Sequence, residues 1–160
     1  TFQSGPNEGK EQRVNLDGAR IYGVETTLRW QATDALLLDG NATWSRPRSF
    51  TDQGTQKLDE KPAWLATGTA TYALPFGLSL MGQARYTGGV YARTEQNTFE
   101  TLPEALILDA RVGYTLASVL DGWNGEIFAR VDNLTDEAKF IGLGLPGPGR
   151  QIRAGIEVSF

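Results

Sequence analysis

Residues 150–160 read Arg-Gln-Ile-Arg-Ala-Gly-Ile-Glu-Val-Ser-Phe, and much of the chain repeats their pattern. The even positions are all apolar: Ile152, Ala154, Ile156, Val158 and Phe160. The odd positions are polar or small: Gln151, Arg153, Gly155, Glu157 and Ser159. Because successive side chains of a strand point to opposite faces, one face here is apolar and the other polar. In water such a terminal strand would be an adhesive edge. In a bilayer its apolar face meets lipid and its last aromatic meets the interface, so the segment predicts a membrane-spanning β-strand.

The same two-residue period predicts further strands that begin near residues 20, 36, 64, 78, 106 and 127, and the C-terminal segment is the last. Each has about 9–12 residues, the length that a tilted strand needs to cross a bilayer. Short connections at residues 32–35, 75–77 and 117–125 alternate with long polar ones at residues 46–61, 88–103 and 135–149. We therefore predict an all-β fold: an antiparallel up-and-down transmembrane β-barrel, present in part as about seven to eight strands, with short periplasmic turns and long extracellular loops.

The predicted organisation has two parts. Residues 1–19 are expected to be a polar loop with a candidate strand remnant at residues 11–15, and residues 20–160 the C-terminal part of the barrel. Thr1 is not an initiator methionine and no signal sequence precedes it, so we expect a longer parent protein. The strands either close a small barrel of about eight or form an open sheet with two edges. Only closure satisfies every strand edge in lipid.

Charged and aromatic side chains are sorted between the two faces. The charges on the less apolar face are predicted to line an aqueous lumen: Glu25, Arg29, Asp39, Arg85, Asp109, Arg111, Arg130, Asp132, Arg153 and Glu157. Near the midplane of the lipid face an Arg or Lys would cost roughly 2–4 kcal/mol. Aromatic residues near both ends of the apolar face predict two girdles: Tyr22, Trp30, Trp44, Trp64, Tyr72, Tyr86 and Tyr114. The strands of a soluble β-sandwich also alternate between apolar and polar residues, but nothing in that fold would place the aromatic residues at two depths.

Composition excludes several classes of function. The chain has no Cys and no His, so it lacks a disulfide framework, a thiolate metal site and the usual hydrolytic constellations. We therefore expect no enzyme activity, no bound metal and no cofactor. A net charge of −4 argues against a nucleic-acid partner, which would require a basic face. The longest apolar runs, such as residues 105–108, are far shorter than a transmembrane helix.

Several short sequences resemble the C-terminal barrel of TonB-dependent outer-membrane receptors. They occur in the family's order: Asn15 and then Gly23-Val24-Glu25, Pro62 after a long loop, Leu102-Pro103 before Asp109, Val131-Asp132-Asn133-Leu134-Thr135-Asp136, and Pro148-Gly149-Arg150 with the terminal Phe160. The resemblance covers about residues 15–160. The family has about 22 strands around a plugged lumen, and neither the plug nor the TonB-contacting segment resembles anything in this chain.

The resemblance implies a receptor of the Gram-negative outer membrane that takes up a ferric siderophore or a similar scarce nutrient. It implies as partners the outer-membrane lipid, the TonB complex through the N-terminal part missing here, and the outer-membrane assembly machinery, which would read Phe160 as its signal. The transported ligand would be a ferric chelate. Ligand contact is predicted for cationic and aromatic residues of the long loops, suited to an anionic, ring-bearing chelate: Arg46, Arg48, Tyr91, Arg93 and Phe99.

Two other functions remain open at this stage. One is a self-contained small outer-membrane barrel that serves as a passive pore or a structural protein. The other is a soluble β-sandwich that binds carbohydrate or protein. The first would carry a signal peptide upstream, and the second would stay in solution without detergent.

Overall fold

The computed structural model describes residues 18–51, 54–58, 61–94, 98–120 and 123–159. The candidate strand remnant at residues 11–15, most of the predicted N-terminal loop, Asn15 and the predicted assembly signal Phe160 lie outside these residues.

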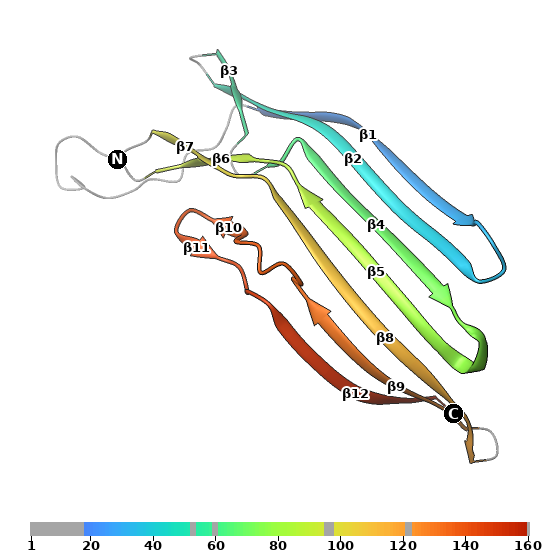
Figure 1. Ribbon diagram of the computed structural model, residues 1–160. Coiled ribbons are helices and arrows are strands. Elements are labelled where there is room, and N and C mark those ends of the chain that lie inside the picture. The colour runs from blue at the N-terminus through green and yellow to red at the C-terminus, as the bar shows by residue number, and fades with distance from the viewer. Residues whose placement is uncertain (1–17, 52–53, 59–60, 95–97, 121–122, 160) are drawn as a thin grey trace.

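The described chain consists of strands, turns, irregular connections and one short 3-10 turn, η1 (Pro75–Gly77). The strands are β1 (Gly18–Gln31), β2 (Leu36–Thr51), β3 (Gly54–Lys57), β4 (Trp64–Ala73), β5 (Leu78–Thr87), β6 (Val90–Arg93), β7 (Phe99–Leu102), β8 (Ala105–Leu120), β9 (Trp123–Asp132), β10 (Phe140–Gly142), β11 (Leu145–Pro146) and β12 (Gln151–Ser159). The main sheet has the order β1-β2-β4-β5-β8-β9-β12, with β3 attached to β2, and each long strand is antiparallel to the next (Figure 1). The predicted antiparallel up-and-down fold is confirmed.

Short turns and long connections alternate as predicted. At the first turn, Thr33 Oγ1 accepts a hydrogen bond of 3.0 Å from the Leu36 backbone N–H. At the second, Phe76 and Gly77 adopt φ values of 62° and 84°. Gly77 is needed there for a second reason, because an added Cβ would come within 3.1 Å of the Thr115 carbonyl oxygen.

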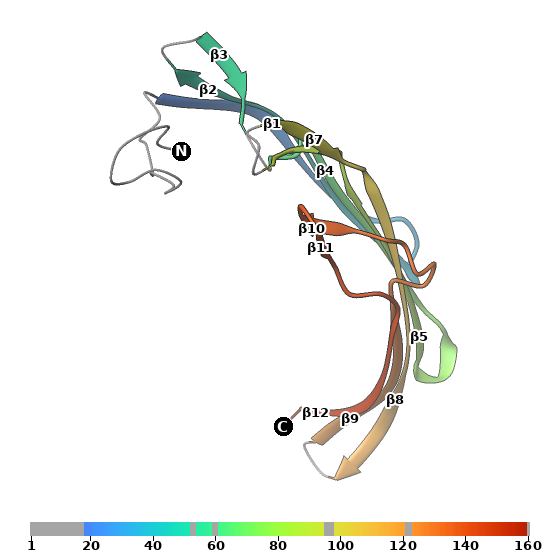
Figure 2. The ribbon, with the colours of Figure 1, turned by 90° about the vertical axis from the view of Figure 1, so that its left-hand side faces the viewer.

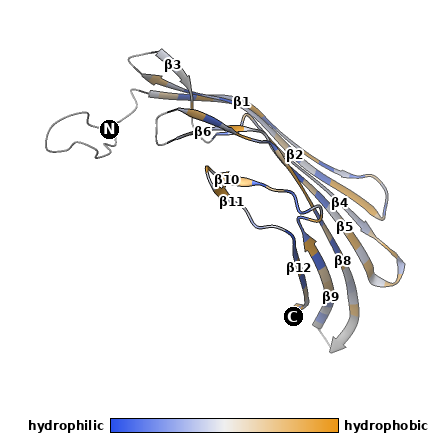
Figure 3. Ribbon diagram, turned by 60° about the vertical axis from the view of Figure 1, so that its left-hand side comes forward, coloured by the Kyte–Doolittle hydropathy of each residue, from blue (hydrophilic) through white to orange (hydrophobic). Residues whose placement is uncertain are grey.

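The register keeps the two faces separate across the whole sheet. One continuous row runs through Leu36, Tyr72, Leu80, Val112, Ala129 and Ala154. A parallel row on the opposite face includes Met81, Arg111, Arg130 and Arg153. A slip of one residue would exchange the two faces of a strand. The unbroken pairing therefore keeps the apolar residues on one face of the sheet and the charged residues on the other, as predicted. Figure 3 shows the resulting alternation of hydrophobic and hydrophilic residues along the strands.

Among the described residues the sheet is a single curved layer, and none of them forms a second layer against its apolar face (Figure 2). Val24 and Ile156 are 60% and 68% exposed, and no large side chain of the described residues is fully buried. A soluble sandwich would cover these residues with a second sheet. An apolar face of this extent that no protein covers is instead a surface for lipid.

Within the described residues β1 and β12 are the two edges of the sheet, and no register joins them. The sheet is therefore open, which is one of the two forms predicted from the sequence. In lipid these edges need further hydrogen-bonding partners.

The long connections contain more strand than the sequence predicted. β2 continues through residues 46–51, which were expected to be loop, and β3 pairs with it. β6 pairs with β7, and β10 with β11, as separate two-stranded ribbons. β8 likewise runs into the predicted turn at residues 117–125. Backbone ladders thus extend where polar side chains had suggested loops, because alternation of apolar residues marks only the part of a strand that faces hydrocarbon.

No helix among the described residues is long and apolar enough to cross a membrane.

Candidate functional site: the charged concave face and the long-loop end

The charged face is the concave one. Figure 2 shows the β10–β11 hairpin on the concave side of the sheet. Lys139, which immediately precedes β10, donates a hydrogen bond of 3.2 Å from Nζ to Thr87 Oγ1. Thr87 has the parity of Arg85 and of the other predicted lumen residues on β5. The charges therefore lie inside the curve, and the apolar residues lie on its convex side.

Arginines of neighbouring strands lie directly opposite one another on this face. Arg111 is the register partner of Arg130, and Arg130 of Arg153. Like charges at such positions repel each other. Carboxylates on both sides of the row offset this cost: Asp109 and Asp132 lie toward the long loops, and Glu126 and Glu157 toward the short turns.

The ion pairs of this arginine row are short and mostly half-buried. Arg111 Nη1 lies 2.6 Å from Glu126 Oε1, and Nη2 lies 3.7 Å from Glu157 Oε2. Arg130 Nε lies 2.6 Å from Asp132 Oδ1. Arg153 Nε donates a hydrogen bond of 3.0 Å to Asp132 Oδ2, and its Nη2 contacts the same oxygen. The row is thus a connected network of charges rather than a set of free cations.

Asp109 is the most buried member, with a side chain that is 0% exposed. It accepts two hydrogen bonds from Arg85, at 2.9 and 3.0 Å, and one of 2.9 Å from the Asn133 backbone N–H. Arg130 Nη2 is 3.9 Å away. One carboxylate therefore joins β5, β8, β9 and the connection after β9. Asn133, at φ 54°, continues this link through hydrogen bonds of its side chain to the backbone of Glu137.

Phe128 packs among the charges instead of facing lipid. Its ring lies under the Arg111 guanidinium, 4.8 Å from Cζ to the centroid. Its register partners are Gly113 and Gly155. A Cβ on Gly155 would come within 3.0 Å of the ring. The aromatic side chain therefore fills the space that Gly155 leaves open, and its ring contacts the Arg111 guanidinium.

The predicted lumen residues fall on one face, as their strand parity requires, but they differ in their surroundings. Arg29 and Asp39 are register partners 3.6 Å apart, and both side chains are substantially exposed. Glu25 is on the same face, without a described ion pair. Glu126 was missed by the sequence reasoning, although its parity within β9 matches that of Arg130 and would have identified it. That the concave face lines a closed lumen remains a prediction.

The predicted girdle residues lie near both ends of the convex face. Trp30, Tyr72 and Tyr114 form a band near the short turns, where they pair with Leu38, Leu36 and Leu78. Tyr22 contacts Trp44 edge-on with ring centroids 6.3 Å apart, and Trp44 lies 6.4 Å from Trp64. These rings form a band near the long-loop end. At the same end, Tyr86 Oη donates a hydrogen bond of 2.5 Å to Glu104 Oε2.

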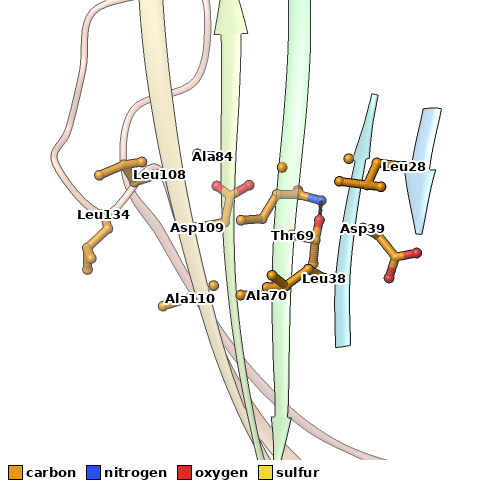
Figure 4. A pocket seen from close by; sticks show the side chains of 14 residues that line it. Leu28, Leu38, Asp39, Thr69, Ala70, Ala84, Leu108, Asp109, Ala110 and Leu134 are labelled. Carbon is orange, nitrogen blue, oxygen red and sulfur yellow. Dashed lines mark hydrogen bonds between the residues drawn. The ribbon is translucent and has the colours of Figure 1, made fainter. Parts of the chain in front are cut away.

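The convex face has a hollow of about 710 Å³ between the two bands (Figure 4). Its lining includes Gly40, Gly68, Ala70, Ala84 and Ala110, with Leu108 and Leu134 at one side. Small side chains on a curved sheet leave this space, and its position on the lipid face suits hydrocarbon.

A second hollow, of about 320 Å³, lies at the long-loop end. Trp44, Arg46, Arg48, Lys61 and Tyr91 contribute to its lining. The structure therefore brings three of the predicted ligand-contact residues together, namely Arg46, Arg48 and Tyr91. The register nevertheless gives Arg46 and Arg48 the parity of Trp44, which is that of the convex face.

The other two predicted contact residues, Arg93 and Phe99, are register partners in the β6–β7 ribbon. Among the described residues, no group of three or more acidic, His or Cys side chains is arranged to hold a metal ion.

Comparison with known proteins gives a consistent result. The family model described as "TonB dependent receptor-like, beta-barrel" matches residues 1–134. The ferric-catecholate import receptor Fiu from E. coli K12 superposes with a TM-score of 0.67 at 20% identity, over 88% of this chain and 20% of that one. The ferripyoverdine receptor of the P. aeruginosa outer membrane, bound to ferripyoverdine, gives 0.67 at 16%, over 86% and 19%. FpvAI in its complex with pyocin S2 gives 0.68 at 16%, also over 86% and 19%. The chain thus spans about a fifth of the length of the solved structures that it matches.

Proposed function

Since this chain belongs to the TonB-dependent receptor-like β-barrel family, we propose that it forms part of the barrel of a receptor that imports a ferric siderophore or a similarly scarce nutrient. The outer membrane of Gram-negative bacteria is where barrels of this family lie, and the strands of this chain cross it. The proposed activity belongs to the whole receptor, of which the solved relatives are about five times as long as this chain.

The observation that best supports the proposal is that the sheet is a single layer with one apolar face and one charged face. Its convex face is apolar and uncovered, and its concave face holds an arginine row neutralised by carboxylates. Such a concave face suits a hydrated barrel interior that encloses another polar body. In the proposed receptor that body is a plug, which the ion-paired row contacts. A self-contained eight-stranded pore would need β1 and β12 to pair, and no register among the described residues favours it.

The proposed ligand is an anionic iron chelate. The names of two structural neighbours support this class, since one is a ferric-catecholate import receptor and the other a ferripyoverdine receptor. Within this chain we assign ligand contact to the β6–β7 ribbon, which carries Tyr91 and Phe99 at the long-loop end. Aromatic side chains there suit the rings of a catecholate-type or related chelate. Arg46 and Arg48 are left out of this assignment because of their convex parity.

Two further partners complete the proposal. Energised release of the ligand requires the TonB complex, which acts through the N-terminal part of the receptor. The outer-membrane assembly machinery would read the C-terminal strand and its final aromatic residue, Phe160. The chain's own contribution is part of the barrel and part of the ligand-binding mouth.

Transport of radiolabelled ferric chelates tests the proposal. The full-length protein would be expressed in cells that lack their own ferric-siderophore receptors, with and without TonB. We expect saturable uptake of at least one chelate class that stops when TonB is deleted. Uptake that persists without TonB, in proportion to external concentration, would instead assign the protein to the passive pores. Tyr91→Ala with Phe99→Ala is expected to raise the apparent Kd for the chelate without changing the amount of folded receptor.

A further inference from the structure

The long connection between β9 and β12 is tied together at its base. Its first stem, residues 133–139, follows β9, its second stem, residues 147–150, leads into β12, and the β10–β11 hairpin lies between them. Asp136 Oδ1 accepts a hydrogen bond of 2.7 Å from the Arg150 backbone N–H, so one side chain joins the two stems. We refer to the residues whose contacts join the stems to each other and to the sheet as the clasp: Asn133, Asp136, Lys139, Gly147 and Arg150.

Two glycines allow the stems to approach each other this closely. The Gly147 N–H donates a hydrogen bond of 2.6 Å to the Lys139 carbonyl oxygen, and a Cβ on Gly147 would come within 3.0 Å of the same oxygen. A Cβ on Gly149 would come within 2.9 Å of Asp136 Oδ1. Because a residue with a side chain would push the backbones apart at both places, the two stems are paired only in this close arrangement.

Asn133 attaches the clasp to the sheet. The residue is 4% exposed, and its backbone N–H donates a hydrogen bond of 2.9 Å to the buried Asp109 carboxylate. Its side chain accepts a hydrogen bond of 2.8 Å from the Glu137 N–H and donates to the carbonyl oxygens of Glu137 and Pro148, at 3.0 and 3.5 Å. A buried polar group that loses its partners costs more free energy than its hydrogen bond contributes. Asn133 therefore favours the one arrangement in which both stems are present.

The base of the hairpin is also attached to the rim of the sheet. Lys139 Nζ donates a hydrogen bond of 3.2 Å to Oγ1 of Thr87, the last residue of β5. On the other side the Leu134 N–H donates one of 2.6 Å to the carbonyl oxygen of Leu108 on β8. Two neighbouring strands thus hold the same stem.

The hairpin carries apolar side chains away from lipid. Ile141 and Leu145 are 68% and 59% exposed, and the hairpin lies on the concave side (Figure 2). On a loose segment such side chains would fold back against other apolar surface, because their burial is favourable. The clasp holds them out instead. Since β6 begins at Val90, shortly after Thr87, the hairpin and the ribbon that carries Tyr91 border the same opening.

From these contacts we propose that the clasp makes the β10–β11 hairpin a fixed wall of the ligand-binding mouth, in one position with and without a bound chelate. Asn133 and Asp136 are its positioning residues, and Lys139 attaches it to β5. A wall that is already in place binds without the entropic cost of ordering a loop, so the clasp contributes affinity and the hairpin does not gate. The inference rests on the proposed function only for the ligand, because the fixed position belongs to the chain itself.

The distance between two spin labels tests the fixed position. This chain has no cysteine, so cysteines introduced at Leu143, in the turn of the hairpin, and at Asp34, in the first short turn, label both ends of the full-length receptor after any cysteine elsewhere is replaced by serine. The ligand is a tris-catecholate gallium chelate, because Ga³⁺ is diamagnetic. We expect one narrow distance distribution that the chelate leaves unchanged. A broad distribution, or a second peak that appears with the chelate, would overturn the proposal.

Covalent attachment of the hairpin to β5 tests whether it has to move. In Thr87→Cys/Lys139→Cys the two thiols are joined by a short bismaleimide that takes the place of the lysine side chain. We expect the linked receptor to keep its uptake rate and its apparent Kd for the ferric chelate. Uptake that stops on linking, while both single-cysteine variants treated in the same way stay active, would make the hairpin a gate and refute the fixed wall.

Variants of Asp136 test its positioning role. Asp136→Ala removes the acceptor for the Arg150 N–H and is expected to raise the apparent Kd for the chelate about fivefold, the equivalent of about 1 kcal/mol, without changing the maximal uptake rate. Asp136→Asn keeps the acceptor and should bind like the wild type. Thr135→Ala, an exposed neighbour in the same stem, is the matched control and should also leave the Kd unchanged. Heat-modifiable electrophoretic migration identifies folded protein.

The linker also separates positioning from a general loss of structure. Joining residues 87 and 139 in the Asp136→Ala background should restore the affinity of the linked wild type. If it does not, Asp136 acts on β12 and not on the hairpin, which contradicts its assigned role. Should Asp136→Ala not fold, Lys139→Gln, which releases only the attachment to β5, takes its place with the same expected rise in Kd. If the wild type takes up no chelate, the proposed function fails, whereas the label distances in the ligand-free receptor still decide whether the hairpin is fixed.

Discussion

Arg85 and Asp109 form a bidentate ion pair across β5 and β8, with Nε–Oδ2 and Nη2–Oδ1 distances of 2.9 and 3.0 Å. The arginine is 45% exposed, whereas the carboxylate is completely shielded from solvent. The pair thus joins a solvated charge to a buried one. Because Asp109 also accepts the Asn133 N–H, the connection that follows β9 depends on the same carboxylate.

Asp109→Ala is expected to be among the most destabilising substitutions in the sheet. Removing one partner of a buried, hydrogen-bonded pair costs roughly 3–5 kcal/mol, and the partial exposure of Arg85 places this case at the lower end. Urea unfolding of the full-length protein in lipid micelles, followed by tryptophan fluorescence, measures the effect. Asp39→Ala is the matched control, because its 3.6 Å contact with Arg29 is exposed and should contribute about 1 kcal/mol or less. Equal effects of the two substitutions would contradict the role of Asp109.

The sequence alone predicted the long strands, their pairing order and the parity of the charges. These features follow from a single rule, the period of two, which holds wherever one face meets hydrocarbon. The rule does not apply beyond the girdles. Arg46 and Arg48 were taken for loop residues because polar side chains follow Trp44 on both faces, although the β1–β2 ladder continues to Phe50.

The partners within the candidate site were harder to predict. Strand parity assigns a residue to a face, but only the register shows that Arg111, Arg130 and Arg153 lie in one row. Phe128 shows the same limit. Its parity within β9 places it on the polar face, but its packing against Gly155 beneath Arg111 depends on the register of three strands.

Gly23→Ala and Gly82→Ala are expected to have opposite effects. A Cβ on Gly23 would come within 2.1 Å of the Trp44 carbonyl oxygen, which belongs to the backbone and cannot move aside. A Cβ on Gly82 would meet nothing within 4 Å. We expect a loss of about 1–3 kcal/mol for Gly23→Ala, and a gain of about 0.5–1 kcal/mol for Gly82→Ala through reduced freedom of the unfolded chain. The same unfolding assay compares them, and tolerance of alanine at Gly23 would mean that β1 and β2 are less closely paired there.

Arg111 and Glu126 are expected to be energetically coupled. Their Nη1–Oε1 distance is 2.6 Å, and both side chains are less than a third exposed. A double-mutant cycle with Arg111→Met and Glu126→Gln isolates the interaction. We expect a coupling free energy of about 1–3 kcal/mol, with the double variant destabilised by less than the sum of the two single substitutions. A coupling near zero would show that Glu157 replaces Glu126 as the partner of Arg111, since it lies only 3.7 Å away.

The orientation of the two faces is tested by placing one charge at matched depth on either side of the sheet. Ala110 lies on the convex face, midway between the level of Tyr86 and that of Tyr114. Thr69 lies on the concave face of β4, next to Gly68, which is midway between the girdle residues Trp64 and Tyr72, and so at nearly the same depth. Ala110→Arg should reduce the free energy of unfolding in lipid by roughly 2–4 kcal/mol, because the guanidinium faces hydrocarbon near the midplane. Thr69→Arg faces water and should change this free energy far less. In lipid-free detergent the difference should shrink, because a micelle deforms around a charge more readily than a bilayer does. Were Thr69→Arg the more costly substitution, the convex face could not be the lipid face.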